Sequence, residues 1–190
     1  MSSLKADFDE VIERMKHGRQ LGHASFEEIY YLVFNPAQIL DVKRQTPAWV
    51  SRLKNEGWSP ETFSIAEHVL AIHREHKLRK IWLTADAKDP GNVEKANQSL
   101  ANALATGALQ ERLEAALKAL EAKPRGLLMV TDLEALHPYL RIGTIEGKLQ
   151  GKFTVPTLFL YPGTRTGKSR LKFLGFYPED GNYRSVHVGG

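Results

Sequence analysis

The sequence predicts an α/β protein: a three-layer domain with a mixed, mainly parallel central sheet and a C-terminal antiparallel extension. Three observations lead to this prediction. Short apolar runs alternate with amphipathic helical stripes, as in β-α-β units. Two of the runs, "LLMVT" and "VPTLFLY", are continuously apolar, as buried parallel strands are. The C-terminal segment instead alternates with a period of two, which indicates antiparallel strands.

The N-terminal part predicts a helix, a strand and a second helix. Ser3 is placed to cap the first helix, and Gly18 to end it. The run "IYYLVFNP" is rich in aromatic and β-branched residues and indicates a buried strand. The second helix is expected to begin with Thr46 as its cap and Pro47 at its first position. The first helix would bury one apolar stripe, formed by Leu4, Phe8, Val11, Ile12 and Met15.

The middle of the chain is mostly helical in its pattern. From Ser59 to Lys80 the pattern is ambiguous, because "TFSI" could be a short strand before a helix, or the whole stretch could be helical. We favour the strand followed by the helix. Two apolar stripes then predict two consecutive helices, or one helix broken at Gly107. The stripes are Val93, Ala96, Leu100 and Ala103, and Leu109, Leu113, Leu117 and Leu120.

The C-terminal half predicts a β-α-β unit. The strand "LLMVT" would end at Asp132, a helix would span "HPYLRIGTIEGKL", and "VPTLFLY" would form the next strand. After a turn, Leu171 and Phe173 alternate with Arg170 and Lys172 as in a strand. The segment "YRSVHV" is expected to form the last strand.

The turn in "YPGTRTGKSRLKF" contains the residue types of a phosphate-binding loop. That motif needs four residues between its first glycine and the Gly-Lys pair, and it must run into a helix. Only three residues separate Gly163 from Gly167, and Pro162 has no N–H to donate. A strand pattern follows where the motif requires a helix. We therefore predict strand, turn and strand, and no nucleotide site here.

The same turn concentrates positive charge. The segment from Arg141 to Lys172 holds seven basic residues and a single acid, Glu146, which gives it a net charge of +6 and leaves −2 for the rest of a chain of net charge +4. Such a patch can bind nucleic acid, with Tyr161 or Tyr177 stacking on bases, or it can be a solvated edge that prevents sheet aggregation. The candidate patch consists of Arg165, Lys168, Arg170 and Lys172.

Asp132 and Glu134 are the candidate functional acids. Asp132 follows a buried strand, at the position where P-loop ATPases place the acid that organises magnesium, so the predicted topology is P-loop-like without a phosphate loop. The two carboxylates could hold a metal or act in acid–base chemistry. An acid at this position can equally cap a helix or join an ion pair. A degenerate P-loop-like ATPase is therefore kept as one hypothesis.

Three histidines form the other group of possible ligands. His68, His73 and His76 lie near Glu67 and Glu75, and His73 and His76 would share a helix face. The spacing is not that of a zinc protease, and a solvated helix face is the favoured interpretation. Cysteine is absent, which excludes disulfides, thiolate catalysis and cysteine-ligated zinc. We expect no cofactor and no catalytic residues.

Length and composition fit one soluble domain over residues 1–190, with 42% hydrophobic and 25% charged residues. Acids interrupt the apolar pattern of the N-terminal segment, so it lacks the core of a signal peptide. No apolar run is long enough to cross a bilayer. We expect a cytoplasmic protein that does not enter membranes and that could form oligomers.

Four motifs lie between Leu127 and Gly190: "TDLEALHPYLR", "LQGK", "VPTLFLYPGTR" and "FLGFYPEDGNYRS". With these motifs, and more weakly with "ADFDEV" and "YYLVFNP", the chain resembles the BrxB family, a small component of bacterial BREX phage-defence systems. The resemblance implies cytoplasmic action beside a DNA methyltransferase, a large ATPase and an alkaline-phosphatase-like protein, PglZ. The family carries no established catalytic residues to transfer.

The resemblance and the lack of a coherent active site favour a non-enzymatic accessory or assembly protein that binds another BREX component, with PglZ as the first choice. The alternatives are a nucleic-acid-binding subunit that uses residues 165–172 and the degenerate ATPase centred on Asp132.

Overall fold

The computed structural model describes residues 3–18, 27–167, 170–181 and 185–190. Its centre is a sheet in the order β2-β3-β4-β1-β7, in which every neighbouring pair is parallel. The predicted mainly parallel sheet is confirmed. The strands are β1 (Ile29–Phe34), β2 (Ser59–Ser64), β3 (Gly126–Thr131), β4 (Thr157–Thr166) and β7 (Val186–Gly189).

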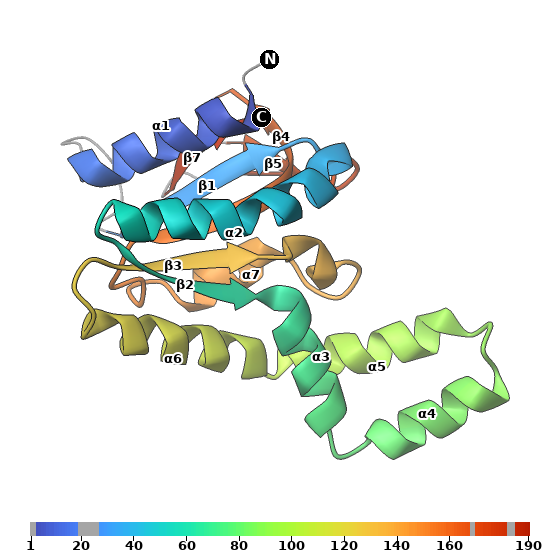
Figure 1. Cartoon of the computed structure of the whole chain (residues 1–190). Helices are drawn as coiled ribbons and strands as arrows, with labels where there is room; N and C mark the ends of the chain where they lie inside the picture. The colour runs from blue at the N-terminus through green and yellow to red at the C-terminus, as the bar shows by residue number, and fades with distance from the viewer. Residues whose placement is uncertain (1–2, 19–26, 168–169, 182–184) are drawn as a thin grey trace.

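Helices cover both faces of this sheet, so the three-layer prediction is also confirmed. In Figure 1, α1 and α2 lie in front of the strands and α7 lies behind them. The face under α1 and α2 buries Phe8 stacked on Trp49 at 4.4 Å, together with Leu53. The other face is covered mainly by α6, α7 and α3. The helices are α1 (Leu4–His17), α2 (Ile39–Asn55), α3 (Ile65–Glu75), α6 (Ala108–Glu121) and α7 (Ile142–Lys148).

Most predicted elements are found where the pattern placed them. Ser3 caps α1, since its Oγ accepts a hydrogen bond from the Ala6 N–H at 3.2 Å. The ambiguous segment is a strand followed by a helix, because β2 ends at Ser64, whose Oγ caps α3 through the Glu67 N–H. The two stripes beyond it are two helices separated at Gly107.

The predicted start of the second helix is wrong. A 3₁₀ turn, η1 (Pro36–Gln38), leads directly into α2, which begins at Ile39 and contains Pro47 in its interior. Proline cannot donate the helical hydrogen bond to the carbonyl four residues earlier, so it usually sits at a helix start. Here the helix continues because Trp49 and Leu53 are buried against the sheet beyond the proline.

The predicted helix across "HPYLRIGTIEGKL" is wrong in its first part. A short 3₁₀ turn, η2 (Leu133–Leu136), follows β3, and α7 begins only at Ile142. His137 has extended backbone, with ψ 135°, because the ring of the following Pro138 disfavours the helical region for the residue before it.

The antiparallel extension is confirmed, but the last strand is not part of it. Strand β4 continues past the main sheet and pairs antiparallel with β5 (Arg170–Phe173), which pairs with β6 (Glu179–Gly181). The backbones approach closely at Gly163, where an added Cβ would lie 2.4 Å from the Lys172 carbonyl oxygen. The chain then returns to the main sheet, since β7 pairs parallel with β1.

Two helices stand apart from the sheet. Beyond α3, the chain forms α4 (Arg79–Lys88), turns, and returns through α5 (Val93–Ala105). Figure 1 shows this hairpin extending beyond the end of α3, away from the strands. We call residues 76–102 the helical arm. The sequence did not predict α4, because its large apolar residues are consecutive and form no stripe at helical spacing.

Candidate functional site

The predicted acids lie at the carboxyl ends of the strands, between β3 and α2. The chain leaves β1 toward α2 on one face of the sheet and leaves β3 toward η2 and α7 on the other. Ligands of parallel sheets bind where connections diverge in this way. Asp132 adopts the left-handed conformation, φ 58°, directly after β3, and this turn directs the chain into η2.

The Asp132 carboxylate is fully engaged by neighbouring side chains. Its Oδ1 lies 2.8 Å from Lys43 Nζ, and its Oδ2 accepts hydrogen bonds from Ser64 Oγ at 2.6 Å and Thr131 Oγ1 at 3.0 Å. Lys43 Nζ also lies 2.8 Å from Glu134 Oε1, in an ion pair without hydrogen-bond geometry. Lys43 thus joins both predicted acids and connects α2 to the end of β3.

Electrostatics favour the charged form of this cluster. Burial by itself would raise the pKa of Asp132, but the hydrogen bonds from Lys43, Ser64 and Thr131 outweigh it and lower the pKa below its ordinary value. Burial would likewise lower the pKa of Lys43, and the two carboxylates raise it instead. At neutral pH the Lys43 ammonium is therefore held against the Asp132 carboxylate.

The space at these strand ends is small. The hollow lined by Lys43, Asp132 and Glu134 has a volume of about 20 Å³, which is room for about one water molecule. Neither β1, nor α2, nor the segment between them contains a glycine, and Pro36 stands in the connection. A phosphate cradle needs successive free N–H groups, which glycine-rich backbone supplies. The arrangement fits a cluster of ion pairs that connects α2 to the end of β3 better than it fits a nucleotide site.

The predicted basic patch is divided between two faces of the β4–β5 ribbon. Arg165 pairs with Leu171, so it lies on the opposite face from Arg170 and Lys172, which pair with Thr166 and Thr164. Arg165 is half-buried, and its Nη1 donates a hydrogen bond to the His187 carbonyl at 2.8 Å. Lys168 lies outside the described residues.

Arg170 and Lys172 remain available at the surface of the extension. Arg170 is exposed and lies 3.8 Å from Glu179, a distance at which the ion pair is weak. Lys172 is half-buried and forms no ion pair with any described residue. The basic surface is thus narrower than the sequence suggested.

Of the two tyrosines predicted to stack on bases, Tyr161 is not accessible. Only 3% of Tyr161 is exposed, and burial raises its pKa far above the ordinary value. Tyr177 is half-buried among Phe176, Arg141 and His137, with the Arg141 guanidinium 4.7 Å from its ring centre. Tyr177 is therefore already packed against this chain's own residues.

A buried polar contact that the sequence did not reveal joins β1 to α7. Tyr31 Oη donates a hydrogen bond of 2.6 Å to Glu146 Oε2, and Glu146 is only 8% exposed. The two residues are far apart in the sequence, and Glu146 is a polar residue on the buried side of a short helix. Only the fold brings them together. The contact satisfies a buried hydroxyl and a buried carboxylate, as buried polar groups require.

The three histidines are occupied by aromatic neighbours. His68 stacks on Phe63 at 3.8 Å, whereas His76 and His73 stack on Trp82 at 4.3 and 5.7 Å. Burial, followed by the positive charge of Arg112, lowers the pKa of His68. Within residues 3–18, 27–167, 170–181 and 185–190, no three histidine or acidic side chains are grouped as a metal site would need.

The helical arm is the most exposed apolar part of the described chain. No residue of the arm is buried. Among the described residues, seven large apolar side chains are exposed, and four of these lie in the arm, with Leu70 on the adjoining helix α3. The four are Leu78 (41% exposed), Ile81 (64%), Leu83 (46%) and Val93 (59%).

The arm also carries charges without partners. It has five basic and three acidic side chains, a net charge of +2. None of the eight forms an ion pair with any residue that the structure describes. Exposed apolar side chains that are rimmed by polar or charged ones mark surfaces that contact another macromolecule.

The fold and these sites define an α/β protein with a parallel sheet, an ion-paired strand end and a projecting helical arm. The family model described as BREX protein BrxB matches residues 61–188, which is more than half of the chain and includes the whole arm. The chain therefore belongs to the BrxB family of BREX proteins. No curated protein and no solved structure matches it. Among the described residues, none of the helices has the length and apolar character needed to span a membrane.

Proposed function

We propose that this BREX phage-defence component is a non-enzymatic assembly protein that binds another protein of its system in the cytoplasm, with a PglZ-type protein as the first candidate. The observation that carries the proposal is the helical arm, which exposes Ile81, Leu83 and Val93 to solvent. A monomeric protein gains no stability from such side chains, whereas a partner that covers them removes apolar surface from water.

The strand ends support the non-enzymatic part of the proposal. Lys43 is ion-paired with both Asp132 and Glu134, and the adjoining hollow of about 20 Å³ leaves no room for a substrate. An enzyme site instead combines a concave pocket with polar groups free to act on a ligand. The cluster thus contributes to the fold rather than to chemistry.

The direct test is retention of each purified BREX protein on immobilised chain at micromolar concentration. We expect the PglZ-type protein to be retained and the other components to be retained only in its presence or not at all. Retention of a different component alone would change the partner and leave the adaptor function intact. If no component is retained, singly or mixed, the proposal is wrong.

Nucleic-acid binding through the β4–β5 ribbon is the second proposal, favoured by the exposed Arg170 and by Lys172, which has no ionic partner in the described part of the chain. Mobility shifts with duplex DNA at two salt concentrations test it. A narrow patch predicts weak binding with a shallow salt dependence, since the log–log slope follows the number of phosphates neutralised. No shift at low salt, or a shift that survives Arg170→Ala with Lys172→Ala, excludes this use of the ribbon.

A further inference from the structure

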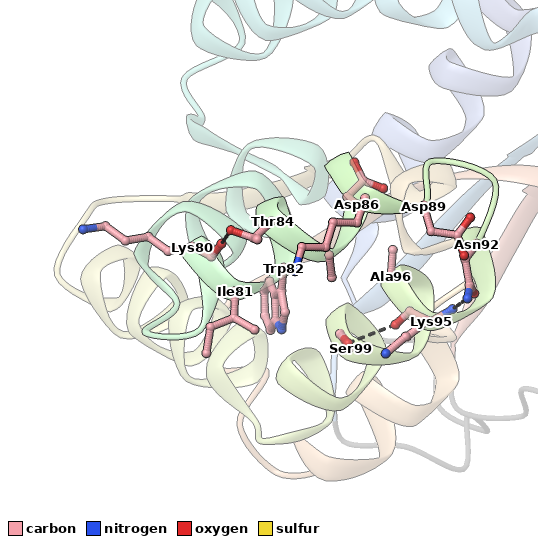
Figure 2. Close-up of a pocket in the computed structure, with 12 residues that line it drawn as sticks. Lys80, Ile81, Trp82, Thr84, Asp86, Asp89, Asn92, Lys95, Ala96 and Ser99 are labelled. Carbon is pink, nitrogen blue, oxygen red and sulfur yellow. Dashed lines mark hydrogen bonds between the residues drawn. The ribbon is translucent and has the colours of Figure 1, made fainter.

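A groove runs between α4 and α5 along the arm. Figure 2 shows Ile81 and Trp82 from α4 and Lys95, Ala96 and Ser99 from α5 around it. Its volume is about 730 Å³, in the range of ligand sites and far above that of the strand-end hollow. Small side chains, those of Thr84, Ala85, Ala96 and Ser99, face the groove from both helices. Another backbone can therefore approach closely.

The two helices are packed against the rest of the described chain only near α3, where Trp82 stacks on His73 and His76 and Leu100 contacts the core. Helix α4 has ten residues and no buried side chain, and the only buried side chains of α5, Ala103 and Leu104, lie beyond the arm. Isolated helices shorter than about 12–15 residues are marginal in water, and most of their stability in proteins comes from a packed apolar face. A third helix in the groove would supply that packing.

The charges around the groove indicate the chemistry of such a helix. Lys80, Lys88 and Lys95 line it, and none of them is paired with a described residue. The lining also contains Asp86 and Asp89, so three lysines against two aspartates leave it with a net charge of +1. Acidic side chains on both sides of an apolar stripe would pair with the lysines. Another copy of the arm would bring like net charges together, which opposes self-association.

We propose that the groove between α4 and α5 holds an amphipathic helix of a partner protein, with an apolar stripe against Ile81 and Ala96 and acidic residues beside Lys80, Lys88 and Lys95. This inference rests on the proposed adaptor function, whose partner it describes. In helix-in-groove recognition, apolar side chains at positions i, i+3, i+4 and i+7 of the bound helix insert into the groove. Here they would fill the space beside the small side chains of α4 and α5 that line the groove.

A matched pair of substitutions tests the apolar contact. Ile81 in the groove is 64% exposed, and Leu40 on α2 is 63% exposed, so glutamate at either position leaves the fold intact. We expect Ile81→Glu to weaken binding of the PglZ-type protein about tenfold or more, because a buried unpaired charge opposes docking. Leu40→Glu should leave affinity unchanged. If both variants bind with the affinity of the wild type, the groove is not the binding site. That result would leave the proposed adaptor function unaffected.

Charge reversal tests the acidic character of the occupant. The triple variant Lys80→Glu, Lys88→Glu and Lys95→Glu should weaken binding about tenfold or more and remove most of its salt dependence. Its control reverses three exposed lysines outside the arm: Lys5, Lys54 and Lys148. If the arm variant binds as well as its control, the occupant is not acidic and the inference fails.

Because the sequence has no cysteine, single cysteines can carry a cross-linker without background. Ala96→Cys places it in the groove, and Ala87→Cys places it on α4 outside the groove lining. We expect a photo-cross-linker at position 96 to capture one acidic helical segment of the PglZ-type protein, and position 87 to capture much less. Capture of a second copy of this chain, of DNA, or of a basic segment overturns the inference. Failure of the wild-type chain to bind any BREX protein overturns the proposed function itself.

Discussion

Helices α6 and α4 show how differently two parts of this protein are held. The four leucines of the α6 stripe are fully buried, at 0% exposure each, whereas α4 has no buried residue. Lys118 on α6 is ion-paired with Glu114, but no charged residue of α4 has an ionic partner among the described residues. Buried apolar side chains stabilise the sheet and its covering helices, whereas the arm leaves large apolar side chains exposed, which the proposed partner would cover.

The largest expected difference between the two regions is in folding stability. Leu117→Ala in α6 removes a side chain of 0% exposure and should lower the free energy of unfolding by about 2–5 kcal/mol. Ile81→Ala in α4 should change it by less than about 0.5 kcal/mol. Urea unfolding measured by far-UV circular dichroism gives both values. A cost at Ile81 that approaches the cost at Leu117 would show that the arm is packed in the free protein.

An intermediate effect on the free energy of unfolding is expected at the ion-paired cluster of Lys43, Asp132 and Glu134. Lys43→Met leaves the partly buried Asp132 and Glu134 without their shared ammonium and should cost about 1–3 kcal/mol at pH 7. Lys54→Met, at an exposed lysine of the same helix, is the control and should be nearly neutral.

The cost of Lys43→Met should also depend on pH. In the wild type the pKa of Asp132 is lowered in the folded state, so its stabilising contribution is present above the ordinary value of 3.8 and is lost as the pH falls below that value. The difference between variant and wild type should therefore shrink in acid. A cost that is the same at pH 7 and pH 3 would mean that lost packing of the lysine, rather than lost charge, explains it.

A smaller effect is expected from His68 on α3. Its pKa is lowered in the folded protein, chiefly by burial, so the unfolded chain takes up a proton near pH 6.5 before the folded chain does. The free energy of unfolding should therefore decrease as the pH falls from 7 toward 5. His68→Phe keeps an aromatic ring against Phe63 and should flatten this decrease. An unchanged pH profile in the variant would assign the decrease to other groups.

The smallest expected effect is from nucleotide. ATP with magnesium should not raise the melting temperature, because the 20 Å³ hollow beside Asp132 has no room for a triphosphate. Thermal unfolding with and without nucleotide measures this. A reproducible rise that Asp132→Asn abolishes would restore the ATPase hypothesis.

The comparison of regions also explains what could be predicted from the sequence. Strands β1, β3 and β4 were predictable because they are buried on both faces and read as continuous apolar runs. The α6 leucines were predictable because one buried face imposes helical spacing. Helix α4 has no buried face, so burial does not require its apolar residues to recur at helical spacing. Ile81, Trp82 and Leu83 are consecutive, and the sequence pattern therefore does not predict this helix.

Contacts between distant residues could not be predicted. The acid at the end of β3 was expected from the strand pattern, but its partner Lys43 lies on a helix whose start the pattern placed too late. The pairing of Tyr31 with Glu146 depends on where α7 crosses β1. Alternation suggested one basic face, but Arg165 precedes the turn and, paired with Leu171, points away from Arg170. In each case three-dimensional pairing, not local preference, decides the contact.

Hydrogen–deuterium exchange of the arm tests the central claim most directly. In the free chain we expect the α4 amides to exchange much faster than those of α6, because α4 has no buried side chain. On addition of the PglZ-type protein, exchange in α4 and the first half of α5 should slow about tenfold or more, while α6 remains unchanged. Slow exchange of α4 in the free chain, or partner binding that leaves the arm unprotected, would contradict the account.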